Sequence, residues 1–206
     1  MFSYTSGTTG DPKGVKLSHK MLLNTGQAVN ARLGHLAMGE ESTIISYLPA
    51  AHSFETALFA TATVFGTRVG FFGGDILKLV SEDIPMLKPT VFPSVPRLYN
   101  KIYSKIQDKF KAATGCSAWL INKGCQTKME NYKTTGTVVN GCYDALIFKK
   151  VKMLLGGNVQ VCITGSAPIA KDVLDFLKIN FCCPIVEGYG MTETSAGSVI
   201  TRADDP

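Results

Sequence analysis

An α/β fold with parallel strand pairing is predicted by two features of the sequence. Short β-rich runs alternate along the chain with segments in which apolar residues recur at helical spacing. Several of the predicted strands run directly into turns that contain glycine, within residues 6–14, 165–168 and 188–190. Such alternation is typical of parallel sheets covered by helices. At 206 residues the chain is within the range of one large domain, and no repeat or linker divides it.

In the first half of the chain, the β-rich runs predicted as strands are residues 2–5, 43–48, 67–72 and 90–92. Ser18 is a suitable N-cap for a helix that extends to about Leu36, because its hydroxyl can accept from the free amides of the first turn. A second helix is predicted over residues 54–65. Pro49 and Pro93 are expected to end the strands that precede them.

In the second half, Pro96 is predicted to open a helix, where its missing N–H costs nothing. The buried stripe of that helix recurs every fourth residue, at Leu98, Ile102, Ile106 and Phe110. Glycines at positions 115, 124, 136 and 141 predict an irregular region over residues 112–143, followed by a helix over residues 145–155. Two further strands, at 159–163 and 184–186, flank a helix whose inward residues are Ile169, Val173, Phe176 and Leu177.

Positive charge is concentrated in residues 97–152, which hold eleven basic and three acidic side chains, although the net charge of the whole chain is only +5. This imbalance indicates a surface that meets phosphates of a cofactor, lipid headgroups or nucleic acid. A solvated lysine-rich helical region is the alternative, and the sequence leaves both open. Nucleic acid is not an expected partner, because no groove-reading or aromatic-interleaved motif accompanies the lysines.

Cysteine usage argues against a zinc site, because the six cysteines form no C-x-x-C spacing and no Cys/His cluster. Reduced thiols are expected, since neither a signal peptide nor an N-x-S/T sequon is present. Cys162, Cys182 and Cys183 are interpreted as core residues. The longest apolar stretch, residues 57–72, is interrupted by threonine, glycine and arginine, so no membrane span is expected in this chain.

The strongest local signal is the segment Thr-Ser-Gly-Thr-Thr-Gly-Asp-Pro-Lys-Gly at residues 5–14, which a strand precedes and a helix is expected to follow. Its glycines let backbone amides turn towards an anion, its hydroxyls add donors, and its lysine adds positive charge. This combination suits a polyphosphate. The spacing is not that of the Walker loop. The candidate phosphate-binding residues are Thr5, Ser6, Gly7, Thr8, Thr9, Gly10 and Lys13.

This segment resembles the phosphate loop of the acyl-adenylate-forming enzymes, which include acyl-CoA synthetases, luciferases and peptide-synthetase adenylation domains. Two further segments match that superfamily in the same order, Gly-Ser-Ala-Pro at 165–168 and Gly-Tyr-Gly-Met-Thr-Glu at 188–193. The resemblance implies the N-terminal domain of these enzymes, with stacked sheets flanked by helices and truncated at both ends. Residues 1–206 would be the central part of the AMP-binding domain, without the small C-terminal domain.

The resemblance also implies a role for each segment. Tyr189 and Ala167 would contact adenine, Thr192 the α-phosphate and Glu193 the Mg²⁺ ion, while the loop with Lys13 would hold the leaving phosphates of ATP. The residues of the two later segments that would bind the nucleotide are Gly165, Ser166, Ala167, Pro168, Gly188, Tyr189, Gly190 and Thr192.

Within the superfamily, the segment Tyr-Leu-Pro-Ala-Ala-His-Ser-Phe-Glu at 47–55 is similar to the long-chain acyl-CoA synthetases, as are residues 68–72, residues 93–103 and the long basic segment. Ala50 departs from the leucine that this branch often has. By the resemblance, His52 lies near the substrate carboxylate and the adenylate, and acts with Thr192 and Glu193 in catalysis. His19 and His35 have no comparable support.

The expected reaction joins a fatty acid to coenzyme A, with ATP and Mg²⁺, through an acyl-adenylate. The chain alone is expected to be inactive, because the resemblance places a ribose-binding aspartate and a catalytic lysine outside it. Two alternatives stay open: an adenylation domain for an aryl or amino acid, or a non-catalytic nucleotide- or anionic-membrane-binding module.

The resemblance further implies a location on the cytoplasmic side. There a parent protein would associate with the endoplasmic reticulum, the peroxisome or the mitochondrial outer membrane. Peripheral contact with an anionic membrane would be made through residues 97–152, which carry the excess of lysine and arginine.

Overall fold

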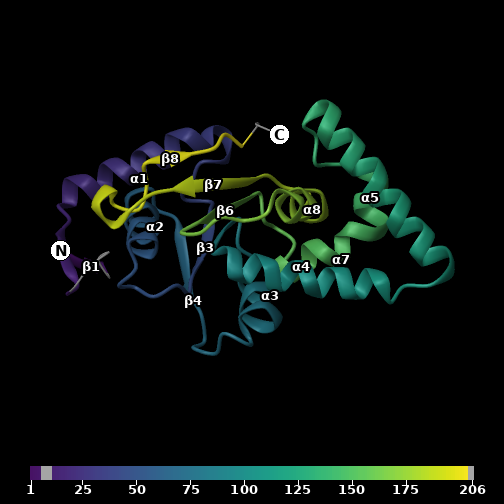
Figure 1. Ribbon diagram of the computed structural model, residues 1–206, viewed down its shortest axis with the longest axis horizontal. Coiled ribbons are helices and arrows are strands. Elements are labelled where there is room, and N and C mark those ends of the chain that lie inside the picture. The colour runs from purple at the N-terminus through teal and green to yellow at the C-terminus, as the bar shows by residue number, and fades with distance from the viewer. Residues whose placement is uncertain (6–10, 204–206) are drawn as a thin grey trace.

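The computed structural model describes residues 1–5 and 11–203, and it confirms the predicted α/β class. Its main sheet has six strands in the order β4-β3-β5-β6-β7-β8 (Figure 1). The first five of these run parallel, and β8 pairs antiparallel at one edge. Their bounds are β3 Thr43–Ser46, β4 Arg68–Phe71, β5 Val91–Ser94, β6 Val161–Gly165, β7 Ile185–Tyr189 and β8 Val199–Ile200.

Helices cover both faces of this sheet (Figure 1). The α-helices are α1 His19–Leu33, α2 Ser53–Val64, α3 Ile84–Leu87, α4 Pro96–Lys111, α5 Gly115–Thr135, α6 Gly141–Tyr143, α7 Lys149–Lys152 and α8 Lys171–Phe181. Short helical turns of other types are η1 Gly34–Leu36, η2 Leu79–Asp83, η3 Asp144–Phe148, η4 Met153–Leu155 and η5 Thr192–Thr194. The long helix α5 packs on α8 and η3, and it stands at the outer end of the molecule.

Adjacent strand residues divide between two hydrophobic cores, as the alternation of side chains along a strand requires. On one face, Ile44, Val91 and Val161 pack with α1 and α2. On the other face, the next residue of each strand (Ile45, Phe92 and Cys162) packs with α4 and α8. Both faces of the sheet are therefore buried, which explains why its central strands read as continuous apolar runs.

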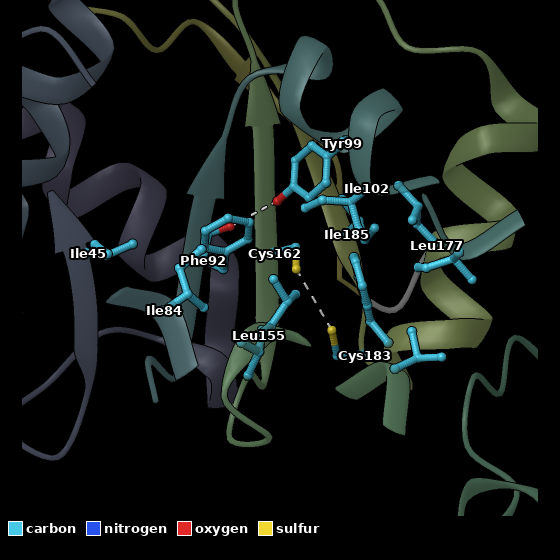
Figure 2. Close-up of a cluster of buried hydrophobic side chains, with 14 of the residues drawn as sticks. Ile45, Ile84, Phe92, Tyr99, Ile102, Leu155, Cys162, Leu177, Cys183 and Ile185 are labelled. Carbon is cyan, nitrogen blue, oxygen red and sulfur yellow. Dashed lines mark hydrogen bonds between the residues drawn. The ribbon is translucent and has the colours of Figure 1, made fainter. Parts of the chain in front are cut away.

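The second core contains a buried polar contact that fixes α4 on the sheet (Figure 2). The hydroxyl of Tyr99 donates to the carbonyl oxygen of Phe92 at 3.0 Å, and the two rings meet edge to face. Close by, the thiols of Cys162 and Cys183 lie 3.9 Å apart. The interpretation of Cys162, Cys182 and Cys183 as core residues is confirmed.

Two helix starts are confirmed. The Ser18 hydroxyl accepts from the amide of Met21 at 3.2 Å, and Pro96 is the first residue of α4. The first helix ends at Leu33, before a 3₁₀ turn, because Gly34 adopts a positive φ of 60°. The four-residue spacing in α4 correctly identified Ile102 and Ile106 as buried, with Leu98 and Phe110 packed partly against the same core.

Other expectations about secondary structure were wrong. Lys13–Lys16 forms strand β2 and not part of a loop, and it pairs antiparallel with β1, Phe2–Thr5. Pro93 lies inside β5 and does not end it. This is tolerated because β5 pairs with β3 at a single position, Ile44 with Val91, before the proline. Neither β8 nor the helical residues 79–87 were predicted.

The predicted irregular region over residues 112–143 is wrong for residues 115–135, because α5 runs without a break through Gly124, whereas Gly136 does end α5 as its C-cap. A methyl group on Gly124 would lie 2.8 Å from the side chain of Ile147 in η3. The glycine therefore allows α5 and η3 to pack closely, and this contact outweighs the low helix propensity of glycine, which costs about 1 kcal/mol. Within the part of the chain that the structure describes, no helix has the length and apolarity needed to cross a bilayer.

Candidate functional site

A cavity of about 200 Å³ lies at the carboxyl ends of β6 and β7. Three segments that are distant in sequence form its wall: the turn between β3 and α2, the turn after β6, and the turn after β7. Its lining residues are His52, Ser53, Phe54, Gly165, Ser166, Gly188, Gly190, Met191, Thr192 and Ala196. This end of a parallel sheet is where ligands of open α/β folds bind.

Glycine backbone forms part of the cavity wall. Gly165 and Gly188 are paired across β6 and β7, and a methyl group on Gly165 would lie 3.0 Å from the carbonyl oxygen of Gly188. A methyl group on Gly190 would lie 2.0 Å from the carbonyl oxygen of Ala196, closer than any real side-chain contact. The turns after β6 and β7 therefore leave little or no room for a side chain at Gly165 and Gly190, and both glycines line the cavity.

Left-handed backbone is concentrated at the same site. Five non-glycine residues have a positive φ in the described ranges, and Ser166 (71°), Ser195 (57°) and Ala196 (74°) belong to the turns around this cavity. Such conformations cost about 1–3 kcal/mol each and persist where the surrounding structure holds them. Strain gathered at one cavity is typical of a binding site.

His52 caps the first turn of α2 and lines the cavity. Its Nδ1 accepts from the backbone amide of Phe54 at 3.1 Å. A ring nitrogen that accepts cannot carry a proton, so the proton of the neutral imidazole is on Nε2. His52 can therefore offer an N–H donor to a ligand from its outer nitrogen.

The hairpin of β1 and β2 contacts η5, the turn that holds Thr192 and Glu193. Thr5, the last residue of β1, is opposite Lys13, the first residue of β2. The elements that carry Lys13 and Glu193 are therefore neighbours, although the two residues are far apart in sequence. The candidate residues between the strands, Ser6, Gly7, Thr8, Thr9 and Gly10, lie outside the described residues.

Several predicted site residues do not line the cavity. Ala167, Pro168 and Glu193 are exposed beside it, and the Tyr189 side chain is 64% exposed. Conversely, sequence reasoning did not select Ser53, Phe54, Met191 and Ala196, which do line it. The first two belong to the segment 47–55 and Met191 belongs to the segment 188–193, so each could have been included. Nothing in the sequence indicates Ala196.

A second, more apolar cavity of about 370 Å³ adjoins the first and lies between α1, α2 and the strand-end residues 196–200. Phe54, Gly188 and Ala196 line both cavities. Its other walls are mainly aliphatic, with Arg32 of α1 among them. A ligand with a polar end in the first cavity could therefore extend an apolar part into the second.

No group of three or more His, Cys, Asp or Glu side chains suited to a metal ion occurs in residues 1–5 and 11–203. Mg²⁺ in nucleotide sites is commonly held by one or two carboxylates together with substrate phosphates, not by a protein cage. Glu193, on the turn beside the cavity, is the kind of single carboxylate that this mode of binding uses.

The family comparison agrees with this geometry. The profile of the family described as "AMP-binding enzyme" matches residues 1–206. The chain therefore belongs to the AMP-binding enzymes.

Within this family, the chain is similar in sequence to a narrower class of proteins, as two relatives show. The chain is 40% identical over 203 residues to long-chain-fatty-acid–CoA ligase 5 of Rattus norvegicus, covering 98% of this chain and 29% of the rat protein. It is 42% identical over 204 residues to the peroxisomal long chain acyl-CoA synthetase 7 of Arabidopsis thaliana, covering 98% and 28%. The chain thus spans less than a third of the length of these relatives.

Solved structures show the same fold at low identity. The N-terminal domain of FACL13 from Mycobacterium tuberculosis superposes with a TM-score of 0.65 at 17% identity, covering 99% of this chain and 39% of that one. The o-succinylbenzoate CoA synthetase of Bacillus subtilis, solved with its acyl-adenylate intermediate, also gives 0.65 at 17% identity, covering 98% and 32%. The predicted fold of the adenylate-forming N-terminal domain is confirmed.

Proposed function

We propose that this chain supplies the nucleotide-binding part of an ATP-dependent long-chain fatty-acid–CoA ligase. The observation that carries the proposal is the cavity in which His52 meets the two glycine turns after β6 and β7. Relatives near 40% identity named as long-chain ligases support the substrate class. The products would be acyl-CoA, AMP and pyrophosphate.

The nucleotide would lie across the ends of β6 and β7. A cavity of 200 Å³ is below the range of about 300–1,000 Å³ for drug-sized ligands, so it fits a base and part of a sugar. Adenine would rest on the backbone of Gly165 and Gly188, bordered by residues 166–168, with the exposed ring of Tyr189 free to close over it. Thr192, at the edge of the cavity, would donate to the α-phosphate.

The leaving phosphates would be held by residues 5–10 and Lys13, next to the turn of Thr192 and Glu193. A carboxylate that attacks the α-phosphorus is an anion approaching an anion. Donors and positive charge fixed around the phosphates lower that barrier because they neutralise the charge and hold the attack in line. Mg²⁺, where Glu193 would hold it, would supply further charge neutralisation.

The acid would occupy the second cavity. Its carboxylate would meet the Nε2–H of His52 at the junction of the two cavities, and its hydrocarbon chain would run between α1 and α2. Burial of the chain there stabilises binding by about 0.8 kcal/mol per CH₂ group. This preference for apolar length is what distinguishes a fatty acid from an aryl or amino acid.

Thioester formation with coenzyme A would also need parts of such ligases that this chain does not match, because the chain spans less than a third of these relatives. We propose that residues 1–206 are the central part of the AMP-binding domain and that the small C-terminal domain does not lie within them. The chain alone would then bind nucleotide without forming acyl-CoA.

Calorimetric titration of the 206-residue chain with AMP and with ATP and Mg²⁺ tests nucleotide binding. We expect Lys13→Ala to weaken ATP more than AMP, because AMP lacks the leaving phosphates. Glu193→Gln should weaken only the binding that depends on Mg²⁺. Equal affinity of the parent and both variants would contradict the assigned roles.

The substrate class is tested by exchange of pyrophosphate into ATP, using the rat ligase in which this chain replaces the matching residues. Palmitate should stimulate exchange, and benzoate or alanine should not. Stimulation by an aryl or amino acid alone would favour the other adenylating branch.

A peripheral contact with anionic membrane through residues 97–152 is a second proposal, consistent with a location on the cytoplasmic side. The Trp119 ring is 66% exposed on α5, and exposed lysines such as Lys109 and Lys150 lie on neighbouring helices. An aromatic side chain among basic ones suits an anionic interface. Binding to phosphatidylserine vesicles should fall with salt and survive Glu193→Gln. Binding that salt does not change would contradict it.

A further inference from the structure

A carboxylate is buried directly beneath the turn that carries His52. Glu55 lies in the first turn of α2, and its side chain is only 5% exposed. Its Oε1 accepts a hydrogen bond from the hydroxyl of Ser46, the last residue of β3. The backbone amide of Leu48 also favours the charged carboxylate. Glu55 therefore ties α2 to the strand end from which the turn departs.

The neighbouring residue on α2 holds the other end of the same turn. The Thr56 hydroxyl lies within hydrogen-bond distance of the carbonyl oxygens of Ala50, at 3.0 Å, and His52, at 3.2 Å. Within the turn, the His52 amide donates to the carbonyl oxygen of Pro49 at 2.8 Å. Two consecutive side chains of α2, Glu55 and Thr56, therefore hold the two ends of the turn at residues 47–52 by hydrogen bonds.

If Glu55 served packing alone, a buried carboxyl at this position would be unfavourable for the stability of the fold. Burial raises the pKa of its carboxyl, and the hydrogen bonds from Ser46 and Leu48 only partly oppose that rise. No Lys, Arg or His forms an ion pair with it within the described residues. A buried acid without a cation costs stability, and an apolar side chain of similar volume would pack there at less cost.

We propose that Glu55 is a positioning residue, which fixes the turn between β3 and α2 so that the Nε2–H of His52 faces the bound adenylate. The effect of Glu55 on nucleotide binding rests on the proposed function. The hydrogen bonds that hold the turn are present without a ligand. Glu55 acts through Ser46 and the turn, and it touches neither cavity. Its carboxylate therefore has no direct part in the chemistry.

The test uses the 206-residue chain with Glu55→Ala, Glu55→Gln and Ser46→Ala, and Glu82→Ala as a surface control. Nitrogen-15 NMR reports the tautomer of His52, and calorimetry reports the affinity for AMP. In the parent and in Glu82→Ala we expect a single Nε2–H tautomer for His52. Glu55→Ala and Ser46→Ala should give a mixture of tautomers and AMP affinity lower by about tenfold, as expected for one lost hydrogen bond that orients the site.

Glu55→Gln should restore both readouts, because its amide oxygen can still accept from Ser46. A Glu55→Ala chain that folds with the parent tautomer and affinity would overturn the proposal, and so would a Glu55→Gln chain as impaired as Glu55→Ala. If Glu55→Ala does not fold, Ser46→Ala decides by the same criteria. Failure of the parent to bind AMP would instead contradict the proposed function, while the tautomer would still test the positioning role.

Discussion

Gly165 and Gly188 face each other on β6 and β7, and a methyl group on Gly165 would approach the carbonyl oxygen of Gly188 to 3.0 Å. This pair is at the carboxyl ends of two parallel strands, where side chains would otherwise close the space. Because neither residue has a side chain, the ends of the strands present bare backbone to the cavity. Substitutions at Gly188 and at Gly190, which also lines the cavity, distinguish effects on binding from effects on folding.

Gly188→Ala is expected to fold normally and bind AMP more weakly. Its added methyl group would be 3.7 Å from the carbonyl oxygen of Thr164, an ordinary contact, but it would enter the junction of the two cavities. Overpacking of about 1–3 kcal/mol corresponds to a Kd raised by about tenfold or more. Calorimetry with AMP and a thermal melt measure the two effects.

Gly190→Ala should instead lower the stability of the fold itself. Its methyl group would meet the backbone of Ala196 at 2.0 Å, so the turn after β7 must shift. Gly141→Ala is the matched control, since nothing lies within 4 Å of the added methyl group. Equal melting temperatures for the two variants would show that the turn is not built as described.

Lys128→Met is expected to destabilise the chain by about 3–5 kcal/mol, because the mostly buried carboxylate of Asp144 would lose the cation that neutralises it. The Lys128 side chain is 1% exposed, and its Nζ lies 2.5 Å from Asp144 and 3.0 Å from the Cys182 sulfur. Urea unfolding measures the loss. Lys78→Met, which removes an exposed ion pair with Glu82, should change stability by less than about 1 kcal/mol.

The stability of the chain should depend on pH through Glu55, and Glu55→Gln isolates that dependence. The pKa of Glu55 is raised by burial in the folded state, so folding favours the protonated form. Its contribution is fully present below the pKa of the unfolded chain and is lost as pH rises through the folded value. Between pH 4 and pH 7, the free energy of unfolding of the parent should therefore fall relative to that of Glu55→Gln. A constant difference would contradict this environment.

Thiol reactivity should divide the cysteines into two groups. Burial raises the pKa of Cys125 and of Cys182 to about 11, whereas Cys116 and Cys142 are exposed. Because the thiolate is the reactive form, maleimide labelling at pH 8 should be about a hundredfold slower or more for the first pair. Peptide mass spectrometry after timed labelling gives the rates. Comparable rates at all four would mean that α5 does not pack as described.

Local signals explain why much of the fold could be predicted. Ser18 and Pro96 mark helix starts through interactions within one turn, and the apolar runs of the central strands mark a sheet buried on both faces. The errors arise where a contact distant in sequence decides the structure. Gly124 stays helical because of Ile147, and Lys13–Lys16 becomes a strand only by pairing with Phe2–Thr5.

The residues of the site likewise divide into those that local sequence signals identify and those that only tertiary contacts place. The turns that contain Gly165 and Gly188 were recognisable as motifs, and both line one cavity with His52. The contribution of Ala196 was not predictable, because its positive φ of 74° comes from the packing of the turn after β7 and not from its own sequence. The exposed positions of Tyr189 and Glu193 likewise depend on tertiary structure.

The central claim is that the glycine turns after β6 and β7 and the segment 5–14 hold opposite ends of one nucleotide. Its most direct test is an NMR titration of the glycine-labelled chain with AMP and then with ATP and Mg²⁺. AMP should shift the amide signals of Gly165, Gly188 and Gly190. ATP should shift those and also Gly7 and Gly10, while the distant Gly136 stays unchanged. If ATP perturbs one motif and leaves the other untouched, the two do not share a ligand and the account is wrong.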